Sequence, residues 1–155
     1  MDNLNFPSYN YRVRNHGQSK QIFDSIRKKY VALTPEEWVR QHMISFLINE
    51  KNYPSALIAV EMPLMLNKLR KRADIVAYNR NGTPLVLVEC KAPAVQVSQT
   101  SFDQAARYCL ATGIKLIIIT NGLSHYCAEI DNEKQAYHFL EDIPFFTDPD
   151  RLNSL

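Results

Sequence analysis

The sequence is poor in glycine and cysteine and has no long apolar segment. Four glycines and three cysteines occur among its 155 residues. The cysteines are too scattered for a disulfide framework and lack the C-x-x-C spacing of a zinc site. No apolar run approaches the ~18–20 residues that span a bilayer. These absences argue against a disulfide-rich secreted domain and against a transmembrane helix.

Two further signals are missing. Residues 1–10 are polar and aromatic and lack the apolar stretch of a secretory signal. The four glycines form no G-x-x-x-x-G-K-[ST] phosphate-binding loop, so the sequence contains no ATP-driven motor motif. We therefore expect a reduced, cytoplasmic protein with no membrane partner.

The length and composition are those of one ordinary globular domain. Hydrophobic residues make up 46% of the chain, charged residues 22%, and the net charge is +2. We expect a single domain over residues 1–155, with an N-terminal extension (1–30), a core (31–140) and a tail (141–155). The overall charge does not by itself indicate a nucleic-acid partner.

Helix and strand patterns alternate along the chain. Thr34, Pro35 and Glu37 form a capping box with proline at the first helical position, which predicts a helix that ends near Lys51. A second helix is expected over 101–112, because Gly113 suits its C-cap. Strands are expected at 11–14, 21–23, 56–63, 73–79, 85–90, 115–120, 125–130 and 136–140. This order predicts an α/β fold with a mixed sheet.

The strands at 73–79 and 85–90 are joined by Asn81-Gly82, the typical signal of a two-residue type I′ hairpin. Counting from that turn places three pairs of residues opposite each other: Arg80 and Thr83, Tyr78 and Leu85, and Val76 and Leu87. The same register places Asp74 opposite Glu89.

Two facing carboxylates indicate a cation site. Their Cβ atoms would lie ~4.5–5.5 Å apart, and like charges in that position are destabilising unless a cation compensates them. Lys91, two residues after Glu89, is expected on the same face. Asp74, Glu89 and the carbonyl of Cys90 offer hard oxygen ligands suited to Mg²⁺ or Mn²⁺. The alternative is a surface ion pair between Lys91 and one of the acids.

Such a site supports phosphodiester hydrolysis. A bound divalent cation polarises the phosphoryl oxygen and lowers the pKa of a bound water, and Lys91 would orient that water or stabilise the developing charge.

Asp74 followed by Glu89-Cys90-Lys91 resembles the D…E-x-K signature of the PD-(D/E)xK nuclease superfamily. That family has a restriction-endonuclease-like αβββαβ core, which agrees with the predicted element order. Ala73 replaces the usual proline before the aspartate. Gln104 and Tyr108 resemble the Q-x-x-x-Y helix of RecB-like members. The resemblance implies a catalytic role for Gln104 and packing or DNA contact for Tyr108, whereas a helix face packed on the sheet is the alternative.

The chain more closely resembles the N-terminal nuclease domain of type I restriction enzyme R subunits, in a short form. The resemblance spans about residues 10–140 and implies DNA as a partner, restriction-system subunits and a homodimer. It also implies an active-site role for Glu37, or next for Glu36, although capping alone explains Glu37. The supporting segments are 34–41, 72–76, 88–93 and 119–122.

Two basic clusters remain. Lys68, Arg70, Lys71 and Arg72 precede Asp74 and would hold the DNA backbone, or else form a solvated loop. The cluster at 27–29 is interpreted as a solvated loop.

The sequence thus predicts an Mg²⁺-dependent DNA endonuclease of restriction or DNA-processing type. The alternative is a non-cleaving DNA- or protein-binding module with a nuclease-like fold.

Overall fold

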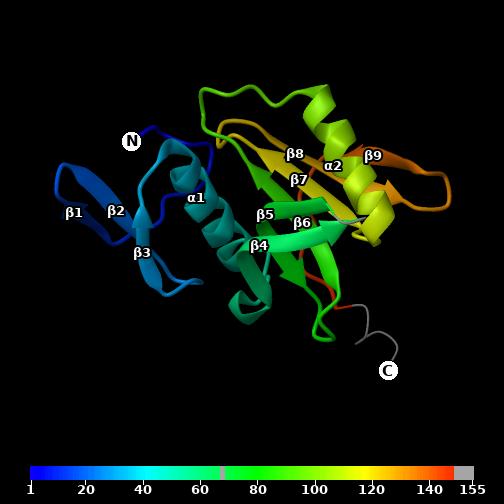
Figure 1. Cartoon of the computed structure of the whole chain (residues 1–155), viewed down its shortest axis with the longest axis horizontal. Helices are drawn as coiled ribbons and strands as arrows, with labels where there is room; N and C mark the ends of the chain where they lie inside the picture. The colour runs from blue at the N-terminus through cyan, green and yellow to red at the C-terminus, as the bar shows by residue number, and fades with distance from the viewer. Residues whose placement is uncertain (67–68, 149–155) are drawn as a thin grey trace.

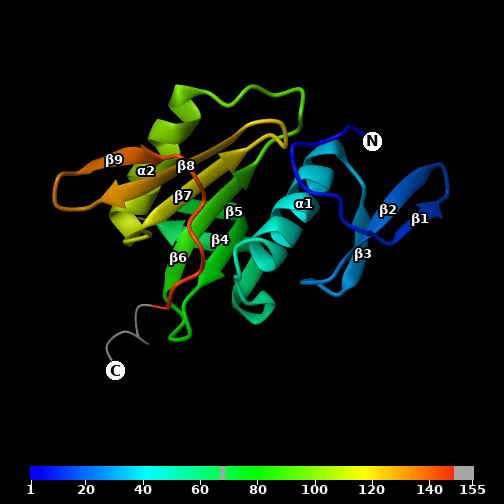
Figure 2. The same ribbon diagram turned by 180° about the vertical axis from the view of Figure 1, so that it is seen from behind.

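The computed structural model describes residues 1–66 and 69–148 and contains two sheets and two principal helices. Helix α1 (Pro35–Asn49) lies between a small N-terminal sheet and the main sheet, and helix α2 (Gln99–Thr112) covers the other face of the main sheet (Figures 1 and 2). No helix within the described ranges is long and apolar enough to cross a membrane.

The small sheet is antiparallel, with strands β1 (Val13–His16), β2 (Ser19–Asp24) and β3 (Lys29–Ala32) in that order. The two strands around the His16-Gly17 turn were predicted, but β3 was not. The turn before β3 uses Lys28 at φ 55°, a conformation that glycine or asparagine would have signalled. The predicted limit of the extension, between residues 30 and 31, falls inside β3.

Helix α1 begins as its sequence predicts. Thr34 is the N-cap, and its Oγ1 accepts a hydrogen bond from the Glu37 N–H at 3.0 Å. Pro35 occupies the first turn, where a missing N–H costs nothing. The helix ends at Asn49, two residues before the predicted limit.

The main sheet has the order β4-β5-β6-β7-β8-β9. Only β6 and β7 run parallel, because α2 connects them as a crossover, and every other neighbouring pair is antiparallel. The predicted αβββαβ core is confirmed. A short 3-10 turn (Ser55–Leu57) precedes the six strands: β4 (Ile58–Leu66), β5 (Leu69–Tyr78), β6 (Pro84–Cys90), β7 (Leu116–Thr120), β8 (His125–Asp131) and β9 (Ala136–Leu140).

The sheet separates two hydrophobic clusters. Val86, Val88 and Cys90 of β6 belong to the cluster shared with α1, and Leu87 belongs to the cluster shared with α2. Strand β7 is buried along its whole length, as its run of isoleucines indicates. Residues 75–77 of β5 and 86–88 of β6 are therefore buried on both faces of the sheet.

Candidate active site

The β5–β6 hairpin does not have the predicted two-residue turn. Only Gly82 has a positive φ, whereas a type I′ turn requires it at Asn81 as well. The Asn79 N–H donates to the Thr83 carbonyl at 2.9 Å, and the Asn79 side chain accepts from the N–H groups of Asn81 and Thr83. The connection is therefore a three-residue loop braced by an asparagine side chain.

A second irregularity corrects the register. Tyr78 pairs with Pro84 rather than with Leu85, and the ladder then shifts so that Ala77 pairs with Val86. The predicted pairing of Tyr78 with Leu85 is wrong, as is that of Arg80 with Thr83, but Val76 does pair with Leu87. The bulge at Leu85 compensates for the longer loop. The ladder reaches Ile75–Val88, one step before Asp74 and Glu89, in the predicted register.

The alternation of side chains between the two faces of β5 is broken at Asp74. Ala73 packs in the cluster on the α2 side, whereas Ile75, two residues later, packs in the cluster on the α1 side. The β4–β5 ladder is interrupted at the same place: Glu61 of β4 has φ 53°, and the ladder passes directly from the pair Val60–Ile75 to the pair Met62–Ala73. Simple alternation therefore does not predict where the Asp74 side chain points.

The two predicted acids make ion pairs with different cations. Asp74 Oδ1 accepts from Arg40 Nη2 of α1 at 2.7 Å, and Asp74 Oδ2 accepts from the Cys90 N–H at 2.9 Å. Glu89 Oε1 lies 2.5 Å from Lys71 Nζ, which itself lies 5.3 Å from the ring centre of Tyr108. The compensating cations are thus Arg40 and Lys71 rather than Lys91, the predicted one.

Arg40 joins a network of carboxylates around the start of α1. Its Nη1 donates to Glu37 at 2.9 Å and lies 3.5 Å from Glu61. Arg27 extends the network, with 2.6 Å contacts to Asp24 and Glu37. The Arg40 side chain is only 7% exposed, and its Nε has no hydrogen-bond partner in the described part of the chain. Arg40 therefore connects the helix, β4 and β5 through charge.

The pKa shifts follow this arrangement. Burial lowers the pKa of Arg40, but the hydrogen bond to Asp74 and the charges of Glu37 and Asp74 outweigh it, so the net shift is upward. Burial also raises the pKa of Asp24, but hydrogen bonds from Arg27 outweigh it and the net shift is downward. Burial and the charge of Asp74 raise the pKa of Glu36, against the opposing charges of Arg40 and Lys91.

The other predicted residues lie around this centre. Glu37 is buried, and its carboxylate accepts from Arg27 and Arg40, whereas only its backbone N–H takes part in capping α1, by donating to Thr34 Oγ1. Lys91 lies just beyond the end of β6, half-buried, with its N–H bonded to the Thr120 carbonyl. On α2, Gln104 is exposed, whereas Tyr108 is buried.

The predicted DNA-contacting cluster is only partly visible. Lys68 lies outside the described residues, and for Arg70 the structure gives only the backbone, paired with Met65. Lys71 is engaged with Glu89. Arg72 is 65% exposed, and its Nη1 lies 3.9 Å from Glu61.

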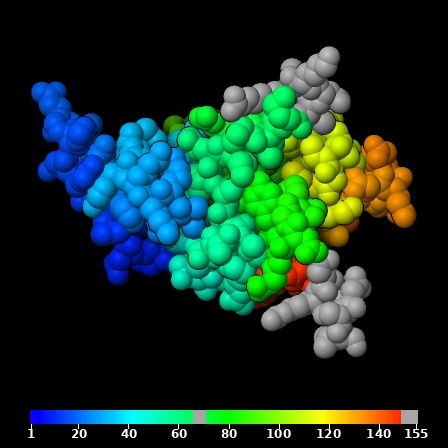
Figure 3. Space-filling view, turned by 60° about the horizontal axis from the view of Figure 1, so that its bottom comes forward, coloured from blue at the N-terminus to red at the C-terminus, as the bar shows by residue number. Residues whose placement is uncertain are grey.

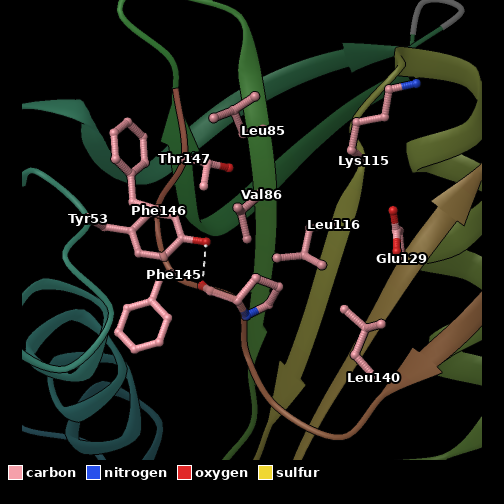
Figure 4. A pocket seen from close by; sticks show the side chains of 11 residues that line it. Tyr53, Leu85, Val86, Lys115, Leu116, Glu129, Leu140, Phe145, Phe146 and Thr147 are labelled. Carbon is pink, nitrogen blue, oxygen red and sulfur yellow. Dashed lines mark hydrogen bonds between the residues drawn. The ribbon is translucent and has the colours of Figure 1, made fainter. Parts of the chain in front are cut away.

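A groove of about 520 Å³ opens beside the network. Arg27, Glu36, Glu37, Arg40 and Glu61 line it, together with residues of β3 and Ala92. A separate, mainly apolar hollow of about 260 Å³ lies at the other end of the sheet, where the Tyr53 hydroxyl donates to the Pro144 carbonyl (Figure 4). None of the predicted site residues lines that hollow, whereas Glu37 lines the first groove.

Sequence reasoning missed Arg40, Arg27, Glu61 and Asp24. One signal was available for Arg40: it is a charged residue between Val39 and Met43, on the buried stripe of α1. A charge in that position requires a buried partner. For Glu61 and Asp24 the sequence offers no comparable signal, because their contacts depend on tertiary structure.

A mixed sheet between two helices, with Asp74 within one strand and Glu89-Cys90-Lys91 at the end of the next, is the architecture of the restriction-endonuclease-like fold. Two solved structures share it. One is a candidate nuclease of the DUF820 group from Anabaena variabilis (TM-score 0.50, 14% identity, covering 92% of this chain and 88% of that one). The other is a fragment of a candidate HsdR subunit of a type I restriction enzyme from Vibrio vulnificus (TM-score 0.51, 24% identity).

The family is shown by sequence. The model of the type I restriction enzyme R protein N terminus matches residues 35–144, and this chain belongs to that family. The match to the Vibrio structure covers 79% of this chain but 25% of that one, so this chain corresponds to a small part of that subunit. No curated protein matches the chain. Family and fold together indicate a nuclease-type function.

Proposed function

We propose that this protein is a divalent-metal-dependent DNA endonuclease whose centre is formed by Asp74, Glu89 and Lys91. The observation that supports it most strongly is the β5–β6 register, because the ladder ends at Ile75–Val88 and the two acids of the D…E-x-K pattern are the next residues along it. Family membership adds DNA as the expected substrate and restriction-system subunits as expected partners.

The donor atoms fit Mg²⁺ or Mn²⁺. Asp74 and Glu89 offer carboxylate oxygens and Cys90 a backbone carbonyl, which are hard ligands. Within residues 1–66 and 69–148 no three His, Cys, Asp or Glu side chains form a metal-binding group. That agrees with Mg²⁺, which often takes one or two carboxylates and completes its shell with water and substrate phosphate. When bound, the ion would polarise the phosphoryl oxygen and activate a water.

The protein's own groups would prepare this centre. The Cys90 N–H fixes one oxygen of Asp74, and Arg40 holds the other. The charge of Lys91 lowers the pKa of Glu36, against the net upward shift of that pKa. The same charge would stabilise the negative charge that develops on the phosphate. Glu37 acts through Arg40 and so serves as a positioning residue. We assign Gln104 to substrate contact, because it is exposed one helical turn before Tyr108.

The decisive experiment is a cleavage assay with supercoiled plasmid, linear duplex and single-stranded DNA in Mg²⁺, Mn²⁺ or EDTA. We expect metal-dependent cutting that is lost in Asp74→Asn, Glu89→Gln and Lys91→Met. Arg107→Met, an exposed change on α2, is the matched control and should cut normally. Undiminished cutting by all three site variants would overturn the proposal. If the wild type cuts nothing but binds DNA in all forms, the non-cleaving binding module is the better description.

A further inference from the structure

The segment that forms the small N-terminal sheet has a larger net positive charge than the whole chain. Residues 10–32 contain six lysines and arginines and one aspartate, a formal charge of +5, whereas the whole chain carries +2. The remaining residues therefore carry −3. The single aspartate, Asp24, is buried and paired with Arg27, so it does not offset the charge at the surface. The sequence-based interpretation of the 27–29 cluster as a solvated loop missed this concentration.

Two arginines on this sheet are held in fixed positions. The guanidinium of Arg12 lies 3.8 Å from the ring centre of Phe23, and that of Arg14 lies 3.8 Å from the ring centre of Tyr30. The two rings pack edge to face at 5.2 Å, and Arg14 Nε also donates to Gln21 at 2.8 Å. Both arginines are exposed. Stacking reduces the rotamer freedom that an arginine must lose when it binds a ligand.

The strand register places these groups on one face. Arg12 lies beside Phe23, Phe23 pairs with Tyr30, and Arg14 pairs with Gln21, so all share the pleat direction. The neighbouring Ile22 and Asp24 point the other way and are buried, with Asp24 bonded to Gln41 of α1. The charged face is therefore turned away from the core. Figure 3 shows the blue end of the chain standing out from the green and yellow body.

The same sheet is tied to the candidate active site. Arg27, in the turn between β2 and β3, contacts Glu37 at 2.6 Å and Glu61 at 3.4 Å. It lines the groove beside Arg40. The sheet that carries the stacked arginines is thus joined, through Arg27, to the groove lined by Glu37, Arg40 and Glu61.

We infer that the β1–β3 sheet is a DNA-binding arm that grips the phosphate backbone of a duplex through Arg12 and Arg14. This rests on the proposed function, since it takes DNA as the substrate. We take a duplex as the partner because a guanidinium group already stacks on one face of each aromatic ring, and that face is not open to an unpaired base. The contact is independent of base sequence, because it addresses phosphate.

Fluorescence anisotropy with a labelled 25-base-pair DNA duplex of arbitrary sequence tests the arm, in EDTA so that no cleavage occurs. Arg12→Gln/Arg14→Gln should bind roughly tenfold or more weakly at 0.1 M salt. Its slope of log K against log salt should be shallower by about 2, since each phosphate contact contributes about 0.9. The control, Arg107→Gln/Lys134→Gln, removes the same charge from exposed sites on α2 and the β8–β9 turn and should bind like the wild type. Melting curves verify that all variants are folded.

Three results would overturn the inference: no duplex binding by the wild type, equal weakening by arm and control variants, or tighter binding of single-stranded DNA or of duplex RNA than of duplex DNA. Failure of the nuclease proposal is distinguishable. A chain that binds duplex DNA through the arm but cuts nothing supports the arm and refutes the endonuclease. A chain that cuts DNA but binds it equally well with and without Arg12 and Arg14 supports the endonuclease and refutes the arm.

Discussion

Replacing Arg40 by methionine is the sharpest test of how the candidate site is held together. Methionine keeps the length and helix propensity of the side chain but removes the charge. Asp74 would then keep only the Cys90 N–H, while Glu37 would keep Arg27. Removing one partner of a buried ion pair costs ~3–5 kcal/mol, and because Glu37 retains a partner the lower end applies. At 2–4 °C per kcal/mol, the expected fall in Tm is roughly 6–12 °C.

The assay is thermal and urea unfolding of the wild type, Arg40→Met and Arg40→Lys, with Arg107→Met as a control. Arg107 is also helical but exposed, so its replacement should change stability by less than about 0.5 kcal/mol. Arg40→Lys should fall between, since lysine keeps the charge but not the two-pronged geometry. A Tm for Arg40→Met within the range of the control would refute the reasoning, because Arg40 would then not be neutralising buried acids.

The same variant reports on metal binding. Arg40 Nη2 occupies Asp74 Oδ1, so a divalent cation has to compete with it. In Arg40→Met that oxygen is free, and millimolar Mg²⁺ should raise the Tm of the variant more than that of the wild type. Equal metal-induced shifts in both proteins would show that Arg40 and the cation do not compete.

Three further predictions concern stability. Thr34→Ala removes the α1 cap and should cost ~1 kcal/mol in urea unfolding. Gly122→Ala should cost more than Gly82→Ala: both have positive φ, worth ~1–2 kcal/mol, but only at Gly122 would a Cβ lie 2.8 Å from Leu4 Cδ2. Burial lowers the pKa of His42 and His125, so the unfolded chain takes up protons that the folded one excludes. Unfolding free energy should therefore fall below pH ~6.5, and less steeply in His42→Gln, when measured from pH 5 to 8.

The elements were predictable because their signals are local. The capping box at Thr34, the C-cap at Gly113 and the apolar run of β7 each depend on a few adjacent residues. The turn between β5 and β6 was not predictable in the same way. Asn79 completes its backbone hydrogen bonds with a side chain, and this competes with the two-residue turn that Asn81-Gly82 favours alone.

Near Asp74 the pairing of β5 with β6 is nevertheless the predicted one, with Val76 opposite Leu87. Burial on both faces of the two strands explains this. A strand whose two faces are both buried cannot slip by one residue without moving every apolar side chain to the wrong cluster. The longer loop must therefore be compensated within the strand, and the bulge at Leu85 does this. Burial of Val76 and Leu87, rather than the turn, fixes the pairing on which the site depends.

What the sequence could not provide is the direction of the Asp74 side chain. Alternation along β5 would send it toward α2, on the side of Val76, yet the interruption opposite Glu61 turns it toward Arg40 of α1. Glu89 keeps its alternation and meets Lys71 beside Tyr108 of α2. The two acids of the D…E-x-K pattern thus belong to two different charge systems, one beside each helix. Substitution of either cation should therefore disturb one acid and spare the other, and this separation is what the Arg40 variants measure.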